Sequence, residues 1–216
     1  MNIVKSLDKK YLIIFDKKNN INYSYFSLKR LKDKIKKKVK IKISFNKRDI
    51  KNFQNIFLVG FISKIKLQKN KNYFTVHESA LPKDRGFSPL KWQIMKKKTN
   101  FTSTLFKLND KLDSGEITFQ ENFKIKKTDM FDEIKLKQMI VTENLISRFI
   151  NKHKNVKLHK QKGRSNYLPK LTELQDKIDP RKALIDQFDI IRSTNPSYKN
   201  YFIINGIKFQ IKIKKI

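Results

Sequence analysis

The sequence places one histidine and one aspartate where they could transfer protons. His77 ends the short apolar segment 73–77 and is followed by a polar loop containing proline and glycine. Such a position corresponds to the carboxyl end of a strand, where open α/β sheets bind ligands. Asp113 lies in the turn-prone stretch 109–115, between two segments that alternate apolar with polar residues. An imidazole and a carboxylate that met in one cleft would support general acid–base chemistry. Taken singly, each residue also fits a structural role in a loop or turn.

Composition restricts the other chemistry that the chain could perform. It has no cysteine, which excludes disulfides, thiolate ligands and cysteine nucleophiles. Its 3 histidines do not easily form a zinc site without carboxylate ligands, and we expect no metal. Only 5 glycines occur in 216 residues, and no glycine-rich turn follows the first predicted strand. A dinucleotide site of the G-x-G-x-x-G type is therefore excluded.

Alternating strands and helices are predicted to position the histidine and the aspartate. Short apolar or alternating segments predict strands, and apolar residues near a 3.6 period predict helices. Strands separated by helices or loops indicate an α/β fold with a mainly parallel sheet. We expect strands at 11–15, 39–45, 56–61, 73–77, 101–108 and 117–125, and helices at 23–38, 90–98, 128–150 and 179–191.

The chain is predicted to divide near residue 150. Residues 1–150 hold the strands and helices of the expected catalytic domain, and residues 151–216 begin with the basic, linker-like stretch 152–170. The end of the chain has two β-rich arms around Asn205-Gly206, the preferred pair for a type I′ hairpin. We therefore expect a basic linker followed by a small subdomain with a helix and a β-hairpin.

The N-terminus and the hydropathy pattern predict a cytoplasmic protein. No apolar window reaches the roughly 20 residues that a membrane-spanning helix needs. The first residues also lack the apolar segment and cleavage site of a signal peptide.

Net charge is an extreme feature of this chain. The 51 Lys and Arg residues against 19 Asp and Glu give a formal charge of +32, which would attract nucleic acid or another polyanion. The lysines are spread over every predicted element, and Asn and Ile are also abundant, as expected from drift toward AT-rich codons. A nucleic-acid partner is therefore possible but not favoured, because modules that bind nucleic acid usually cluster their charge.

Two ordered motifs carry a family resemblance. The segment from His77 to Gly86 reads His-Glu-Ser-Ala-Leu-Pro-Lys-Asp-Arg-Gly, and the segment from Asp113 to Ile117 reads Asp-Ser-Gly-Glu-Ile. They resemble the folate-dependent formyltransferase family, with its His-x-Ser-x-Leu-Pro-x-x-x-Gly and, farther along, Asp-Ser/Thr-Gly-Asp/Glu-Ile. The resemblance implies a shortened Rossmann-like formyltransferase domain. The wording His-Glu-Ser-Ala-Leu-Pro is similar to the branch that acts on amino sugars, including nucleotide-linked ones.

The resemblance implies transfer of a formyl group from 10-formyltetrahydrofolate to an amine. His77 would act as a base or stabilise the oxyanion, and Asp113 would orient it and help to move the proton. The family usually has an asparagine two residues before this histidine, where the present chain has Thr75. We include Thr75 in the expected catalytic set, and the donor to the oxyanion stays open.

Further site residues follow from the same resemblance. The folate would lie along the loop after the apolar strand and the loop before the aspartate, at Phe61, Ile62, Ser63, Leu108, Asn109 and Asp110. Cations are suited to a nucleotide diphosphate because a guanidinium binds phosphate through two hydrogen bonds. The expected substrate-binding residues are Ser79, Lys83, Arg85, Gly86 and Arg192.

Three functions are compatible with the sequence. An N-formyltransferase acting on an amino sugar, nucleotide-linked as the resemblance implies, agrees best with the motif wording. Methionyl initiator tRNA is the alternative acceptor, and the charge would suit it. Enzymes of that kind normally append a sizeable β-barrel domain, for which the residues after Pro169 are too few. In the third alternative the protein binds nucleic acid without catalysis, or is a degenerate relative in which His77 and Asp113 are incidental.

Overall fold

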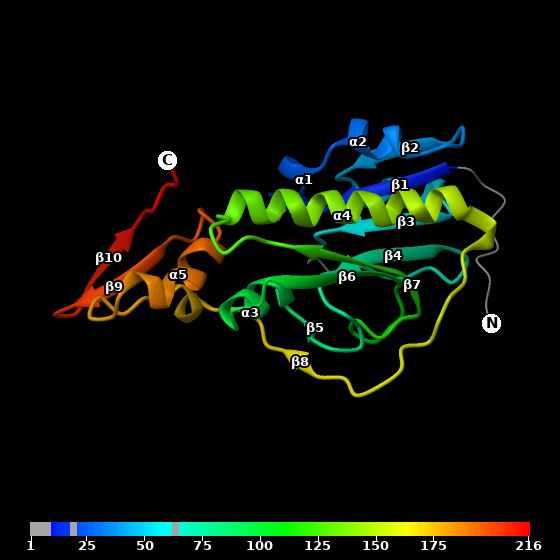
Figure 1. The fold of residues 1–216 in the computed structure, drawn as a ribbon. Helices are drawn as coiled ribbons and strands as arrows, with labels where there is room; N and C mark the ends of the chain where they lie inside the picture. Colours follow the sequence, from blue (N-terminus) through cyan, green and yellow to red (C-terminus); the bar gives the residue numbers. More distant parts are fainter. Residues whose placement is uncertain (1–9, 18–20, 62–64) are drawn as a thin grey trace.

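A six-stranded sheet forms the centre of the computed structural model, which describes residues 10–17, 21–61 and 65–216. The strand order is β2-β1-β3-β4-β6-β7 (Figure 1). The first four strands in this order are parallel to one another, and β6 and β7 are antiparallel additions. The predicted α/β class with a mainly parallel sheet is confirmed. The bounds are β1 Lys10–Phe15, β2 Lys40–Ser44, β3 Asn55–Val59, β4 Asn72–His77, β6 Asn100–Lys107 and β7 Ile117–Lys124.

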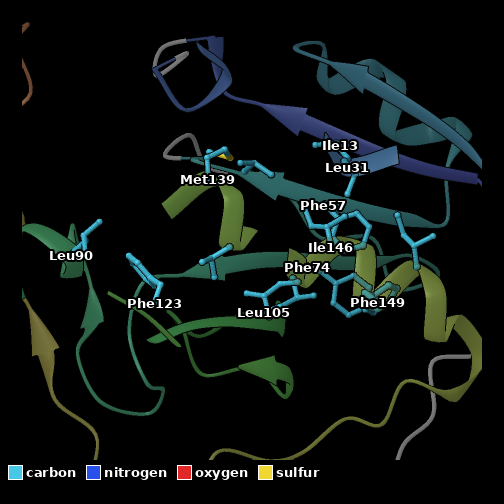
Figure 2. Packing of buried hydrophobic residues seen from close by; sticks show 14 of the residues in the cluster. Ile13, Leu31, Phe57, Phe74, Leu90, Leu105, Phe123, Met139, Ile146 and Phe149 are labelled. Atoms are coloured by element: carbon cyan, nitrogen blue, oxygen red, sulfur yellow. The ribbon is translucent and has the colours of Figure 1, made fainter. Parts of the chain in front are cut away.

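The long helix α4 (Phe131–Lys152) covers one face of this sheet. Its Phe149 packs on Phe74 of β4, with ring centroids 4.4 Å apart, inside the larger hydrophobic core (Figure 2). A smaller core on the opposite face includes Tyr73 and residues of β1 and β3. Because side chains alternate along a strand, Tyr73, Thr75 and His77 face away from α4.

The predicted helix at 23–38 is wrong as a single element. The structure has two short helices there, α1 (Ile21–Tyr25) and α2 (Leu28–Asp33). Ser27 separates them because its side chain accepts a hydrogen bond from Arg30 N at 3.1 Å and caps α2. Serine competes for backbone hydrogen bonds in this way and therefore favours caps over helix interiors.

The remaining helices are α3 and α5, which contact each other. Helix α3 spans Pro89–Met95, and α5 spans Leu184–Ser193, so α5 begins later than the predicted residue 179. Strands β9 (Asn200–Ile204) and β10 (Ile207–Ile211) form the predicted hairpin. Asn205 and Gly206 both have positive φ, of 49° and 78°, as a type I′ turn requires.

The segment expected to be a linker lies along the sheet and its loops (Figure 1). After η3 (His153–Asn155), the backbone of His159 exchanges hydrogen bonds with Ile117 at the start of β7. Strand β8 (Tyr167–Leu168) then pairs in parallel with β5 (Arg85–Gly86). These pairings join residues 156–168 to the sheet domain. None of the helices in the described part of the chain is long and apolar enough to cross a membrane.

Candidate active site

His77 is the last residue of β4 and its side chain is buried. Its Nε2 lies 2.7 Å from the carbonyl oxygen of Asp84, in the loop that follows the strand. A carbonyl oxygen only accepts hydrogen bonds, so we assign the proton of neutral His77 to Nε2. Nδ1 then has an unprotonated lone pair, which is the form a general base requires.

Asp113 reaches His77 from the loop between β6 and β7. Its Oδ2 lies 3.7 Å from Nδ1 of His77, and both side chains are largely buried. The structure thus brings together the two residues on which the sequence motifs centre. At this separation the two atoms are too far apart for a hydrogen bond, but an N–H donor placed between them could bind both.

Gln161 fixes the loop that carries Asp113. Its Nε2 donates to the carbonyl oxygens of Asp113 and Gly115, each at 2.8 Å. Asp113 has a φ of +48°, a left-handed conformation that a non-glycine residue adopts at an energetic cost. Gly115 lies so close to the end of β6 that a Cβ there would be 1.6 Å from the Lys107 carbonyl oxygen. Asp113 and Gly115 belong to the sequence motif, whereas Gln161 lies beyond it and was not among the predicted site residues.

Gly86 binds the carboxylate of Asp113 through its backbone. Its backbone N–H donates to Oδ2 of Asp113 at 2.8 Å. Gly86 has a φ of +102°, and a Cβ at this position would be 2.3 Å from the carbonyl oxygen of Leu168 in β8. A side chain is therefore excluded, and the predicted substrate-binding Gly86 contacts the aspartate through its backbone.

A family model for formyl transferases matches residues 4–150, which is more than half of the chain. The chain belongs to the formyl transferase family. It is 26% identical over 155 residues to the methionyl-tRNA formyltransferase of Mycoplasma capricolum, covering 70% of this chain and 49% of that protein. The chain therefore spans about half the length of the curated relatives it matches.

Solved structures of the formyl transferase family share this fold. A methionyl-tRNA formyltransferase from Clostridium thermocellum superimposes with a TM-score of 0.77 at 19% identity, covering 96% of this chain and 93% of that chain. A 4-N formyltransferase from Francisella tularensis gives a TM-score of 0.67 at 20% identity, with 96% and 99% covered. At these identities the likeness establishes the fold alone.

Thr75 takes the position where the formyl transferase family usually has an asparagine, and its side chain is bound to the sheet. Its Oγ1 donates to the carbonyl oxygen of Leu58 in β3 at 2.8 Å. A hydroxyl has one proton to donate. In this arrangement Thr75 joins β4 to β3 and has no proton left for an oxyanion.

Two of the residues expected to bind folate, Phe61 and Leu108, lie on the sheet face that carries His77. Phe61 and Leu108 pack, half-buried, against the smaller core that includes Tyr73, and Leu108 N donates to Tyr73 O at 2.8 Å. Asn109 and Asp110 are exposed. The Asn109 side-chain oxygen accepts from Lys111 N and Ser114 Oγ within the loop. Ile62 and Ser63 lie outside the described residues.

Arg85 and Lys83 remain near the site, whereas Ser79 has a structural role. The guanidinium of Arg85 donates to Oε1 of Gln161 and to the hydroxyl of Tyr167. Lys83 is exposed on the same loop. Ser79 is buried, and its Oγ donates to the Lys83 carbonyl oxygen at 2.6 Å, so it shapes the loop from within.

Arg192 is buried in α5, away from solvent. It is 1% exposed, and its Nε donates to Oδ1 of Asp189 at 2.6 Å. Its Nη1 donates to the carbonyl oxygens of Lys126 and Asp129, before α4. A guanidinium committed in this way fastens α5 to the sheet domain, and the expected contact with a diphosphate does not fit this position.

Proposed function

We propose that this protein transfers a formyl group from 10-formyltetrahydrofolate to a primary amine. The observation that carries the proposal is the approach of His77 Nδ1 to Asp113 Oδ2 at 3.7 Å, in a formyl transferase fold. Both atoms are hydrogen-bond acceptors when His77 is neutral. An amine nitrogen with two N–H bonds satisfies both acceptors, which places its lone pair for attack on a carbonyl carbon.

His77 is the base in this scheme. The amine must lose a proton as its nitrogen bonds to the formyl carbon, and Nδ1 accepts that proton. The imidazolium then donates from Nε2 to Asp84 and from Nδ1 toward Asp113, so both protons face oxygen atoms. As the bond between the formyl carbon and the folate nitrogen breaks, Nδ1 returns its proton to that nitrogen, so the products are the N-formyl amine and tetrahydrofolate.

The folate would lie on the face that His77 shares with Phe61 and Leu108. These half-buried apolar side chains suit an aromatic ring, and they lie beside the smaller core. The loop 109–113 offers mainly backbone groups, because Asn109 uses its side-chain oxygen internally. The folate, when bound, supplies the formyl group. The chain contributes the base, His77, and the surface that orients the folate.

We propose an amino sugar, nucleotide-linked, as the acceptor. Tyr167 is 57% exposed, and the Arg85 guanidinium carbon lies 5.8 Å from the centroid of its ring. An exposed aromatic ring beside a cation suits a sugar or base with an attached diphosphate. A sugar N-formyltransferase from Shewanella shares the fold with a TM-score of 0.65 at 18% identity, which agrees with a sugar acceptor.

Methionyl-tRNA is the second candidate acceptor. The curated relatives reported above and the formal charge of +32 both favour it. A tRNA would contact many lysines at once, so its reaction would lose rate steeply as salt rises, whereas a small sugar would depend on salt weakly.

A formyl-transfer assay with 10-formyltetrahydrofolate tests the proposal. Nucleotide-linked amino sugars and charged initiator tRNA serve as acceptors, and the variants are His77→Gln and Asp113→Asn. We expect each variant to lose about 100- to 10,000-fold in kcat. Matched controls are His159→Gln and Asp33→Asn, whose side chains are exposed. Equal rates in parent and site variants would refute the proposed chemistry.

A further inference from the structure

A basic hollow of about 370 Å³ lies on the sheet face that carries His77. It is formed by η2 (Lys47–Asn52) and by residues 65–68, which precede β4. Ile50 belongs to the smaller hydrophobic core and Ile65 packs against it, so these two form an apolar floor. The full lining is Lys47, Arg48, Ile50, Lys51, Ile65, Lys66 and Gln68.

The charge of this hollow is of one sign. Its lining includes Lys47, Arg48, Lys51 and Lys66, all exposed, and no acidic residue. Asp49 lies in η2, but its two oxygens accept from Lys42 and Ser44 of β2. The sequence has no Asp or Glu from residue 50 to His77. A concave surface lined by several positive charges attracts anions, because the electrostatic potentials of these charges add up.

The walls of the hollow are fixed to each other. Lys71 is buried, and its Nζ donates to the carbonyl oxygens of Lys51 at 3.0 Å and Phe53 at 2.7 Å. Asn72 N also donates to Gln54 O at 2.7 Å. These bonds join the end of η2 to the segment before β4. A hollow whose shape is set before binding loses less conformational entropy when a ligand enters.

The hollow begins where the proposed folate surface ends. Nζ of Lys47 lies 5.4 Å from the centroid of the Phe61 ring, and Phe61 is one of the residues proposed to contact folate. A folate whose formyl group is at His77 must extend its glutamate end away from the reacting atoms. Each added γ-linked glutamate contributes one more carboxylate to that end.

We propose that this hollow, named here the tail site and lined as above, binds the poly-γ-glutamate tail of the folate co-substrate. The inference rests on the proposed function. The tail site adds affinity for the longer-chain forms of the co-substrate and takes no part in the chemistry. Its ligand is an oligo-carboxylate chain, bound through the four exposed cations over an apolar floor.

Titration calorimetry with tetrahydrofolate monoglutamate and pentaglutamate tests the tail site in the intact chain. We expect the pentaglutamate to bind the parent about 10-fold more tightly at low salt. This advantage should shrink between about 0.05 M and about 0.5 M salt. In the triple variant Arg48→Gln/Lys51→Gln/Lys66→Gln, the two ligands should bind equally, with monoglutamate affinity unchanged.

A second triple variant controls for net charge. Lys29, Lys32 and Lys37 are exposed in or just after α2, which packs on α4 on the other side of the sheet. Changing these three lysines to Gln removes the same charge and should keep the 10-fold advantage. An equal loss in both triple variants would mean a general field effect and would overturn the tail site.

The remaining outcomes separate this inference from the proposed function. Absence of monoglutamate binding would overturn both. Monoglutamate binding with no gain from the tail would overturn the tail site alone. UDP is titrated in parallel as a nucleoside diphosphate probe: if the tail-site variant weakens UDP binding and leaves the pentaglutamate advantage intact, the hollow serves the acceptor and the tail assignment is wrong.

Discussion

Gln161 donates from Nε2 to the carbonyl oxygen of Asp113 at 2.8 Å, from a segment far along the chain. The same nitrogen also donates to Gly115, and the oxygen of this side chain accepts from Arg85. One carboxamide therefore connects the aspartate loop to the loop that follows His77. Gln161 is a positioning residue in this arrangement, since it contacts loop backbone and an arginine.

Replacing Gln161 with Met should impair the geometry of Asp113 without removing any group from the proposed chemistry. We expect kcat to fall about 10- to 100-fold, since small displacements of reacting groups have effects of that size, with a smaller change in KM. The exposed Gln210→Met is the matched control. If the two variants are equally stable in urea but differ in kcat, Gln161 acts as a positioning residue. Equal kcat values in the two variants would contradict this role.

Gly86→Ala should disturb the site more than Gly163→Ala. The two glycines have φ values of +102° and +101°, so the cost of a left-handed conformation is shared. A Cβ at Gly86 would meet the Leu168 carbonyl oxygen at 2.3 Å, whereas nothing lies within 4 Å at Gly163. We expect Gly86→Ala to lose about 1–3 kcal/mol more in free energy of unfolding, measured by urea denaturation, and most of its activity. Similar losses of stability in both variants would show that the positive φ, and not the contact with Leu168, determines the effect.

Arg192→Met should lower stability and leave ligand affinity unchanged. Its guanidinium is 1% exposed and paired with Asp189, so we expect a loss of about 2–3 kcal/mol in free energy of unfolding. Arg181, whose side chain is 89% exposed, provides the control Arg181→Met with little effect. A normal stability combined with weaker binding of a nucleotide-linked sugar would restore the substrate role that the sequence suggested.

Asp129 should make the fold sensitive to acid. Its carboxylate is buried; burial alone would raise its pKa, but hydrogen bonds from Lys137 and from Lys126 N outweigh this and lower the pKa. A carboxylate with a folded pKa below its unfolded value, about 3.9, stabilises the fold above that pH. The contribution disappears as pH falls through the folded pKa.

Urea unfolding at several pH values checks this expectation. At pH 7, Asp129→Asn should be less stable than the parent by about 1–3 kcal/mol, and the difference should narrow below about pH 4. The exposed Asp186→Asn serves as a control that follows the parent throughout. A difference that stays constant down to strong acid would show that the charge of Asp129 does not contribute.

The sequence by itself determined the strands, the hairpin turn and the two residues at the centre of the site. Short apolar runs set the strands β1, β3 and β4, because a strand covered on both faces needs apolar residues at nearly every position. Asn205-Gly206 set the hairpin, because few residue pairs accept two positive φ values. The motifs around His77 and Asp113 identified the pair through a family resemblance.

Only the tertiary structure decided how the rest of the chain serves that pair. Gln161, the β5–β8 pairing and the burial of Arg192 all depend on contacts between segments distant in sequence, for which local propensity and periodicity have no signal. The same holds for Thr75, whose hydroxyl is committed to β3 by strand register. Local sequence fixes which backbone a segment favours, whereas the partner of each polar group depends on where the other segments pack.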